Sequence, residues 1–260
     1  MSNRRMSVLE RWQGMCLLAG VVLVWELGAH LNVINAAFLP PPTQIAAAFA
    51  DAITSGEMAA AALLTLARCL GGYALTAIAG IILGVLMGIS QRIYSLLEPL
   101  IEMLRPIPSA AVIPIAILFL GIDERMKLAV IMFGSLWPIL LNTIHGVRSV
   151  DPLLIDTGRT FNLTGSAFLW KIVIPASLPH IATGLRISLA ISLILTITVE
   201  MIAGSSGLGF LILDYERSFR YPPMYAGIVL LGLIGFLLNA VVVSVERRWL
   251  AWTRQSLPST

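Results

Sequence analysis

The chain has 260 residues, of which 58% are hydrophobic and only 12% are charged. A typical soluble domain carries about 25% charged residues, and a soluble fold of this length could not bury so much apolar surface. The composition therefore excludes an ordinary soluble domain. It predicts an integral membrane protein, with residues 1–260 forming a single transmembrane domain.

The formal net charge of +3 does not indicate nucleic-acid binding, because the basic residues form no compact patch and no run interleaved with aromatic residues. We expect arginines to hold helix ends against anionic headgroups, so the partner implied by this charge is the lipid bilayer. Cys16 and Cys69 lie in apolar stretches without metal-ligand spacing. They predict neither a metal site nor a disulfide.

Apolar runs of about 20 residues can cross the hydrocarbon core of a membrane, which is about 30 Å thick. The chain contains six, which predict an all-α bundle of six transmembrane helices at 15–33, 60–89, 97–120, 126–147, 181–203 and 224–245. The core of the domain is expected over 60–247. The basic segment 1–11 precedes the first run without a small-residue cleavage site, so we expect a retained span. Prolines at 40–42 stop a helix, and Thr43 is predicted to cap a short interfacial helix over 44–53.

The 17 lysines and arginines are spread unevenly over the predicted loops. If the N-terminus is inside, ten lie in inside segments, four in outside segments and three within spans. Because positively charged loops stay on the cytoplasmic side, this distribution predicts that both termini are cytoplasmic.

The longest predicted inside loop covers residues 148–178, between the fourth and fifth spans. Asp151, followed by proline, is a good N-cap, and Asn162 tolerates the left-handed conformation that ends a helix. A second short helix is predicted over 166–174. The prolines at 175 and 179 are expected to separate this helix from the fifth span. The loop is thus a helix–turn–helix with apolar faces too large for a plain connector.

This loop resembles the coupling loop of ATP-binding-cassette (ABC) importer permeases, whose pattern is E-A-A, three residues, G and then an aliphatic residue before proline. Residues 156–158 stand at E-A-A, Asn162 at the glycine and 174–175 at the end. The resemblance implies docking in a groove of an ATPase subunit through Asp156, Thr157, Gly158, Arg159, Thr160, Phe161, Asn162, Leu163, Thr164, Gly165 and Pro175. The replacement of both alanines implies a dedicated ATPase partner.

The resemblance extends over residues 38–248 and is greatest to permeases of the nitrate, taurine and aliphatic-sulfonate branch. Ordered matches carry it at 38–42, 104–108, 113–114, 119–124, 138–143, 146–151, 183–186 and 200–209. It implies an importer of the bacterial cytoplasmic (inner) membrane with two permease copies, two ABC ATPase subunits and an extracytoplasmic solute-binding protein. The implied substrate is an aliphatic sulfonate, taurine or nitrate, and the branch also includes importers of pyrimidine-type and other small nutrients.

The sequence lacks a nucleotide-binding P-loop, in which a glycine-rich loop is followed by Lys and then Ser or Thr. Its only lysines, Lys127 and Lys171, are followed by Leu128 and Ile172. We therefore expect no cofactor and no enzymatic activity in this chain, with ATP and Mg²⁺ bound by the partner ATPase. A gradient-driven secondary carrier is the alternative, which the coupling loop and the lack of an internal repeat disfavour.

Ionisable groups inside the spans are candidates for a transport pathway, because burying them in a membrane is costly. Glu200, followed by Met201, could shape a gate or form a structural salt bridge with Arg68. Pro108 should help to break the third span beside Arg105, which could then attract an anion or reach the inner surface. The predicted pathway residues are Glu200, Arg105, Pro108, Met201 and Arg68.

Three expectations concern packing. Small residues let helices approach closely, within the chain or at a seam between two copies, and they recur in the second span at Gly72, Gly80, Gly84 and Gly88. Glu98 and Glu102 are expected to pair with Arg105. Glu26 and His30 are expected to form a polar packing pair and not a metal site.

Overall fold

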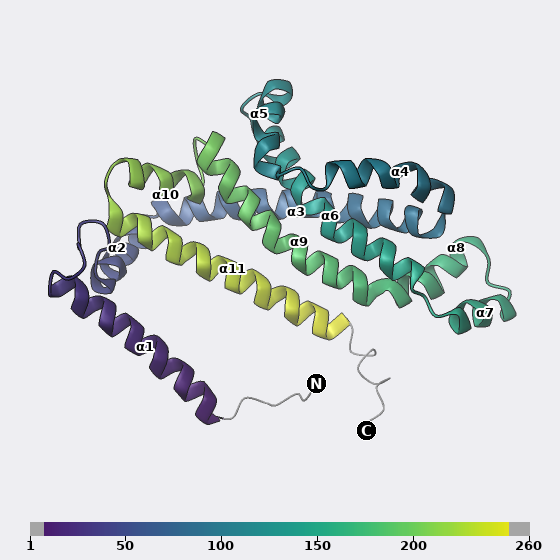
Figure 1. Cartoon of the computed structure of the whole chain (residues 1–260), viewed down its shortest axis with the longest axis horizontal. Helices are drawn as coiled ribbons and strands as arrows, with labels where there is room; N and C mark the ends of the chain where they lie inside the picture. The colour runs from purple at the N-terminus through teal and green to yellow at the C-terminus, as the bar shows by residue number, and fades with distance from the viewer. Residues whose placement is uncertain (1–7, 250–260) are drawn as a thin grey trace.

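A computed structural model describes residues 8–249, which form helices and, in that part of the chain, no strand. Most helices run along one elongated bundle, with α2 and α10 at one extreme and α7 and α8 at the other (Figure 1). We call these the α10 end and the α7 end. The helices are α1 (Val8–His30), α2 (Pro42–Thr54), α3 (Glu57–Ile89), α4 (Gln91–Leu104), α5 (Ser109–Leu120), α6 (Glu124–Arg148), α7 (Pro152–Thr160), α8 (Gly165–Phe168), the π-helical turn η1 (Leu169–Val173), α9 (Ile174–Ala203), α10 (Leu208–Arg217) and α11 (Tyr221–Trp249).

Helices α3, α6 and α9 form the centre of the bundle, and α3 meets α6 through a row of glycines. A Cβ atom added to Gly84 would lie 2.6 Å from Cβ of Thr143, which leaves no room for a side chain. A Cβ atom added to any other glycine of the row would lie 2.9 Å or less from an α6 side chain; these glycines are Gly72, Gly80 and Gly88. The predicted close approach is confirmed, but it lies within one chain. The suggested seam between two copies is wrong for this face, because α6 already occupies it.

Four helical stretches are long and apolar enough to cross a membrane, residues 57–89, 124–148, 165–203 and 221–248. The predicted third span is broken, because α4 and α5 meet at an angle of 100° and together would make a fifth span. Pro106 and Pro108 account for the break, since each lacks an N–H and restricts the residue before it. The apolar part of α1 is shorter, Cys16–His30. The protein is therefore an all-α, multi-pass membrane protein.

A polar contact joins α1 to α2. The Glu26 carboxylate accepts hydrogen bonds from the Thr43 backbone N–H (3.1 Å) and hydroxyl (2.7 Å), and it lies 2.9 Å from His30 Nε2. The prediction that Thr43 caps α2 is wrong, because α2 begins at Pro42 and its N-cap, Pro41, has no side-chain oxygen. The expected polar pair of Glu26 and His30 is confirmed. Three of the ten basic residues counted in the predicted inside segments lie outside the described residues: Arg4, Arg5 and Arg254.

Candidate functional site

The α7 end carries the helix–turn–helix predicted over 148–178. The Asp151 side chain accepts a hydrogen bond from the Leu153 N–H at 2.8 Å, and Pro152 occupies the first position of α7. The helix closes at Asn162, whose φ of 53° is left-handed. Both local predictions, the N-cap and the left-handed end, are confirmed.

Gly158 is the buried residue of α7 and explains one departure from the E-A-A pattern. A Cβ atom at this position would lie 2.9 Å from Phe168 Cε2 and 3.3 Å from Ile172 Cγ1. Glycine costs helix stability by up to about 1 kcal/mol, but here it lets α7 rest directly on the helix that follows. The hydroxyls of Thr157 and Thr160 donate to the carbonyls of residues 153 and 156, within α7 and one turn earlier in each case.

The predicted separation between the second short helix and the fifth span is wrong. Helix α8, the π turn η1 and α9 follow one another without a gap, so residues 165–203 form one helical stretch. The π turn ends at Val173, two residues before Pro175, and we attribute the continuity to this wider turn. It makes room where the proline ring would otherwise meet the Lys171 carbonyl. Pro179 is accommodated inside α9.

The α7 end presents large apolar side chains to its surroundings. Leu153 is 72% exposed, Phe161 74% and Trp170 67%. Asp156 and Arg159 lie 3.3 Å apart with both side chains exposed, so this ion pair contributes little to stability. A hollow of about 500 Å³ separates the turn from α3 and α6, and its lining includes Leu163, Thr164, Gly165, Phe168, Val147 and Gly88. Most of the predicted coupling residues are exposed at this end, while Leu163 and Pro175 are partly buried and Gly158 is buried.

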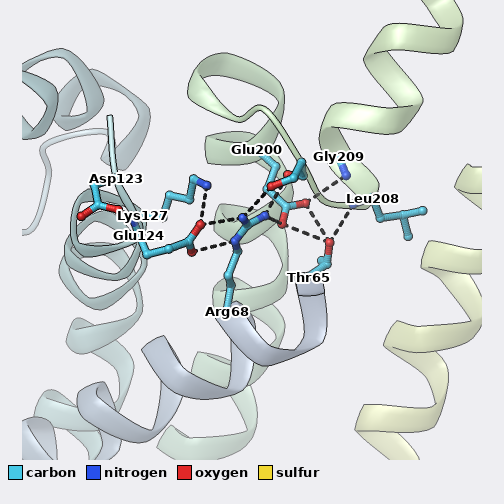
Figure 2. A network of polar contacts seen from close by, with 9 residues as sticks. Thr65, Arg68, Asp123, Glu124, Lys127, Glu200, Leu208 and Gly209 are labelled. Atoms are coloured by element: carbon cyan, nitrogen blue, oxygen red, sulfur yellow. Dashed lines mark hydrogen bonds and ion pairs between the residues drawn. The ribbon is translucent and has the colours of Figure 1, made fainter. Parts of the chain in front are cut away.

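At the α10 end, a buried arginine joins three helices (Figure 2). Arg68 of α3 donates two parallel hydrogen bonds to Glu124 of α6, at 2.6 and 2.8 Å. Its third nitrogen donates to Glu200 of α9 at 2.7 Å. The Arg68 side chain is 4% exposed and the Glu200 side chain 0% exposed. The salt bridge considered for Glu200 and Arg68 is therefore present.

Glu200 also organises the connection between α9 and α10. Its carboxylate accepts hydrogen bonds from the Thr65 hydroxyl at 2.8 Å and from the Gly209 N–H at 3.0 Å, and that hydroxyl accepts from the Leu208 N–H at 2.8 Å (Figure 2). Gly207 has a φ of 103°, and a Cβ atom there would fall on the Glu200 carboxylate. The connection thus folds around this carboxylate, whose negative charge lies at the positive N-terminal end of α10.

The charges of this cluster compensate one another. Lys127 donates to Glu124 at 2.8 Å and its side chain is 6% exposed. Two cations, Arg68 and Lys127, therefore face two carboxylates, Glu124 and Glu200. Burying ions is costly unless each is paired and hydrogen-bonded, and here every member is. The arrangement holds α3, α6, α9 and α10 together; it leaves no unpaired cation to bind an anion.

Sequence reasoning missed three members of the cluster, Thr65, Glu124 and Lys127. The bond from Arg68 to Glu124 spans 56 residues and that from Thr65 to Glu200 spans 135. No local pattern marks these long-range partners, whereas Lys127 pairs with Glu124 at a spacing of three residues, which the sequence does show. The available signal was general: a cation inside an apolar span requires a carboxylate from another span.

The other predicted pathway residues lie apart from this cluster. Arg105 is exposed at the break between α4 and α5, and in the described part of the chain it forms no salt bridge, so the expected pairs with Glu98 and Glu102 are absent. Pro108 is the N-cap residue of α5. Met201, partly buried, follows Glu200. No group of three metal-ligating side chains occurs among residues 8–249.

Near the other side of the α10 end, the Tyr215 hydroxyl donates to Glu57 Oε2 at 3.1 Å. Burial, together with the neighbouring Glu57 carboxylate, raises the pKa of Tyr215. The contact ties the C-terminal part of α10 to the start of α3.

The family model described as "Binding-protein-dependent transport system inner membrane component" matches residues 77–251. The chain belongs to this family. An aliphatic sulfonates transport permease protein, SsuC, of Bacillus subtilis (strain 168) is 33% identical over 240 residues, covering 92% of this chain and 87% of the relative. The taurine transport system permease protein TauC of Escherichia coli (strain K12) is 31% identical, covering 90% and 87%.

This permease is also similar to the nitrate import permease protein NrtB of Leptolyngbya laminosa, with 34% identity over 71% of this chain and 66% of the relative. A chain of the MetNI methionine ABC transporter in an inward-facing conformation has the same fold, with a TM-score of 0.66 at 17% identity, covering 75% of this chain and 97% of that chain. The protein is thus the membrane permease subunit of an ABC importer.

Proposed function

We propose that the permease works as a dimer of identical chains with six spans each, both termini cytoplasmic, in the bacterial cytoplasmic membrane. The single domain would cover residues 1–260, with α1 and the bent pair α4–α5 completing the four long spans. Two ABC ATPase subunits bind at the α7 end and supply ATP and Mg²⁺ chemistry, and a solute-binding protein delivers substrate at the α10 end. The distribution of lysines and arginines supports this orientation.

The observation that carries the proposal is the continuous helix between the two ends. The exposed coupling surface at Leu153, Asp156 and Phe161 rests through Gly158 on the α8–η1 helix, which continues into α9. Helix α9 has 30 residues and is therefore about 45 Å long. Its last turn contains Glu200, inside the cluster that holds α10. Closure of the ATPase pair would displace α7 and move α9 as a lever against the outer connections.

The substrate class follows from the relatives and from Arg105. The named relatives serve aliphatic sulfonates, taurine and nitrate, which are all small anions, and we propose the same class here. Arg105 lies exposed at the broken span beside Pro108, where a guanidinium can bind an anion without first breaking a salt bridge. Met201 would contribute apolar lining, while Arg68 and Glu200 hold the outer gate in place. Importers of pyrimidine-type nutrients are the alternative within the branch.

The test is reconstitution of the complete importer. The tagged permease, its ATPase and its binding protein are co-expressed and purified, and the native mass gives the stoichiometry. Two permeases with two ATPases, and ATP-dependent uptake of labelled taurine, an aliphatic sulfonate or nitrate into vesicles, are expected. A permease that purifies without ATPase and transports on an ion gradient alone would overturn the proposal and establish a secondary carrier.

A further inference from the structure

The turn that ends α10 has a phenylalanine where helices usually carry glycine. The Phe219 N–H donates to the Glu216 carbonyl at 3.0 Å, and the Arg220 N–H donates to the carbonyl of residue 215 at 2.8 Å. These two bonds form a Schellman motif, whose left-handed position is held by Phe219 with a φ of 57°. In this conformation the Cβ atom of an L residue lies too close to the following carbonyl oxygen. Glycine, or asparagine as at Asn162, is the ordinary choice there.

The Phe219 ring belongs to an exposed group of aromatic side chains at the α10 end. Its side chain is 77% exposed, so packing within the chain does little to offset the cost of the left-handed turn. The centroid of its ring lies 6.4 Å from that of Tyr221, which lies 5.6 Å from that of Phe38, itself 60% exposed. We call these three rings the aromatic patch. A residue that is costly in its conformation and still exposed points to a contact outside the chain.

The charges near Phe219 favour a protein partner over a lipid surface. The last turn of α10 and the residues after it carry four exposed charged side chains, Asp214, Glu216, Arg217 and Arg220. Their charges cancel, whereas segments that bind anionic lipid headgroups carry clusters of Lys and Arg. Aromatic rings with arginines and a polar rim are instead the usual composition of a protein–protein interface.

The aromatic patch lies beyond the ends of the spans, which disfavours a second copy of the chain as its partner. Tyr221 is the first residue of α11 and precedes the apolar run that begins at Met224. Phe38 lies in the connection between α1 and α2, at the α10 end of the bundle (Figure 1). Two copies in one membrane have the same orientation, so their α10 ends face the same aqueous side and the copies meet laterally. The position therefore favours a partner that approaches from that aqueous side.

We propose that the aromatic patch is the anchor on which the solute-binding protein docks, with the Phe219 ring in an apolar recess of that protein. The family is described as binding-protein-dependent, and the ATPase subunits are assigned to the opposite, α7 end. The inference rests on the proposed function, because it requires the α10 end to lie outside. The left-handed turn fixes the direction of the ring before docking, which lowers the entropy lost on binding.

The test measures affinity of the purified binding protein for the complete importer in lipid nanodiscs, together with the melting temperature. Phe219→Gly removes the ring and relieves the left-handed turn, so it should weaken the affinity about thirtyfold without lowering the melting temperature. Phe219→Asn should behave alike. Phe236→Ala is the control, a phenylalanine 69% exposed in the spanning part of α11, and should leave the affinity unchanged. A loss below about threefold for both Phe219 variants, or an equal loss for the control, would overturn the proposal.

Photocrosslinking identifies what contacts the ring. With p-benzoylphenylalanine in place of Phe219, irradiation should join the permease to the binding protein. Crosslinks to phospholipid alone, or to a second permease, would overturn the proposal. Failure of the proposed function is distinguishable, because the unmodified importer would then show no ATP hydrolysis stimulated by the binding protein, and both ideas would fall. If the unmodified importer is stimulated and the Phe219 variants are stimulated equally at low binding-protein concentration, the docking surface alone is wrong.

Discussion

Replacing Arg68 by glutamine would expose how much the cluster at the α10 end depends on charge compensation. The substitution removes the cation from Glu200, whose side chain is 0% exposed, and leaves it only the donors of Thr65 and Gly209. Removing one partner of a buried ion pair costs about 3–5 kcal/mol. For a chain of this size each kcal/mol lowers the melting temperature by about 2–4 °C. We therefore expect a decrease on the order of 10 °C.

The measurement is thermal unfolding of the purified permease in detergent, followed by circular dichroism. Arg159→Gln is the control, because that arginine is 74% exposed and its ion pair is worth little. The double variant Arg68→Gln/Glu200→Gln removes the uncompensated charge and should recover at least half of the lost stability. A loss below about 1 kcal/mol for Arg68→Gln, or a double variant no more stable than the single one, would refute the reasoning from buried charge.

Three further outcomes are expected. Gly84→Ala should destabilise the protein by about 1–3 kcal/mol, because its Cβ would lie 2.6 Å from an α6 side chain. Gly232→Ala is the control, since a Cβ atom there has no neighbour within 4 Å, and it should be neutral or stabilising in the same unfolding assay. Equal effects of the two substitutions on the free energy of unfolding would contradict the packing argument. Phe161→Glu should abolish co-purification of the ATPase without lowering the melting temperature of the permease. Arg217→Glu, at the opposite end of the bundle, should leave co-purification intact. An ATPase that still co-purifies with Phe161→Glu would exclude this surface as the docking site. Arg105→Ala should reduce uptake of the anion by about tenfold with ATPase binding unchanged, and unaltered uptake would remove Arg105 from the pathway.

Local features of the coupling loop could be predicted because they depend on neighbours in sequence. Asp151 caps α7 through an N–H two residues away, and the left-handed Asn162 ends it. The predicted break before α9 was wrong, although its cause is also local. The expectation that proline interrupts a helix assumes ideal α-helical geometry. The wider π turn at 169–173 lets the helix continue through Pro175.

Composition, the spacing of apolar runs and the position of basic residues are properties of the chain itself. Partition into a membrane depends on the side chains of each segment in turn, so an all-α membrane protein, the broken third span and the helix–turn–helix after α6 followed from the sequence. The partners of Arg68 and the surface that the glycine row meets depended on tertiary structure. They arise where segments far apart in the sequence come together, and a buried charge or a small residue indicates that a partner is needed without indicating which one.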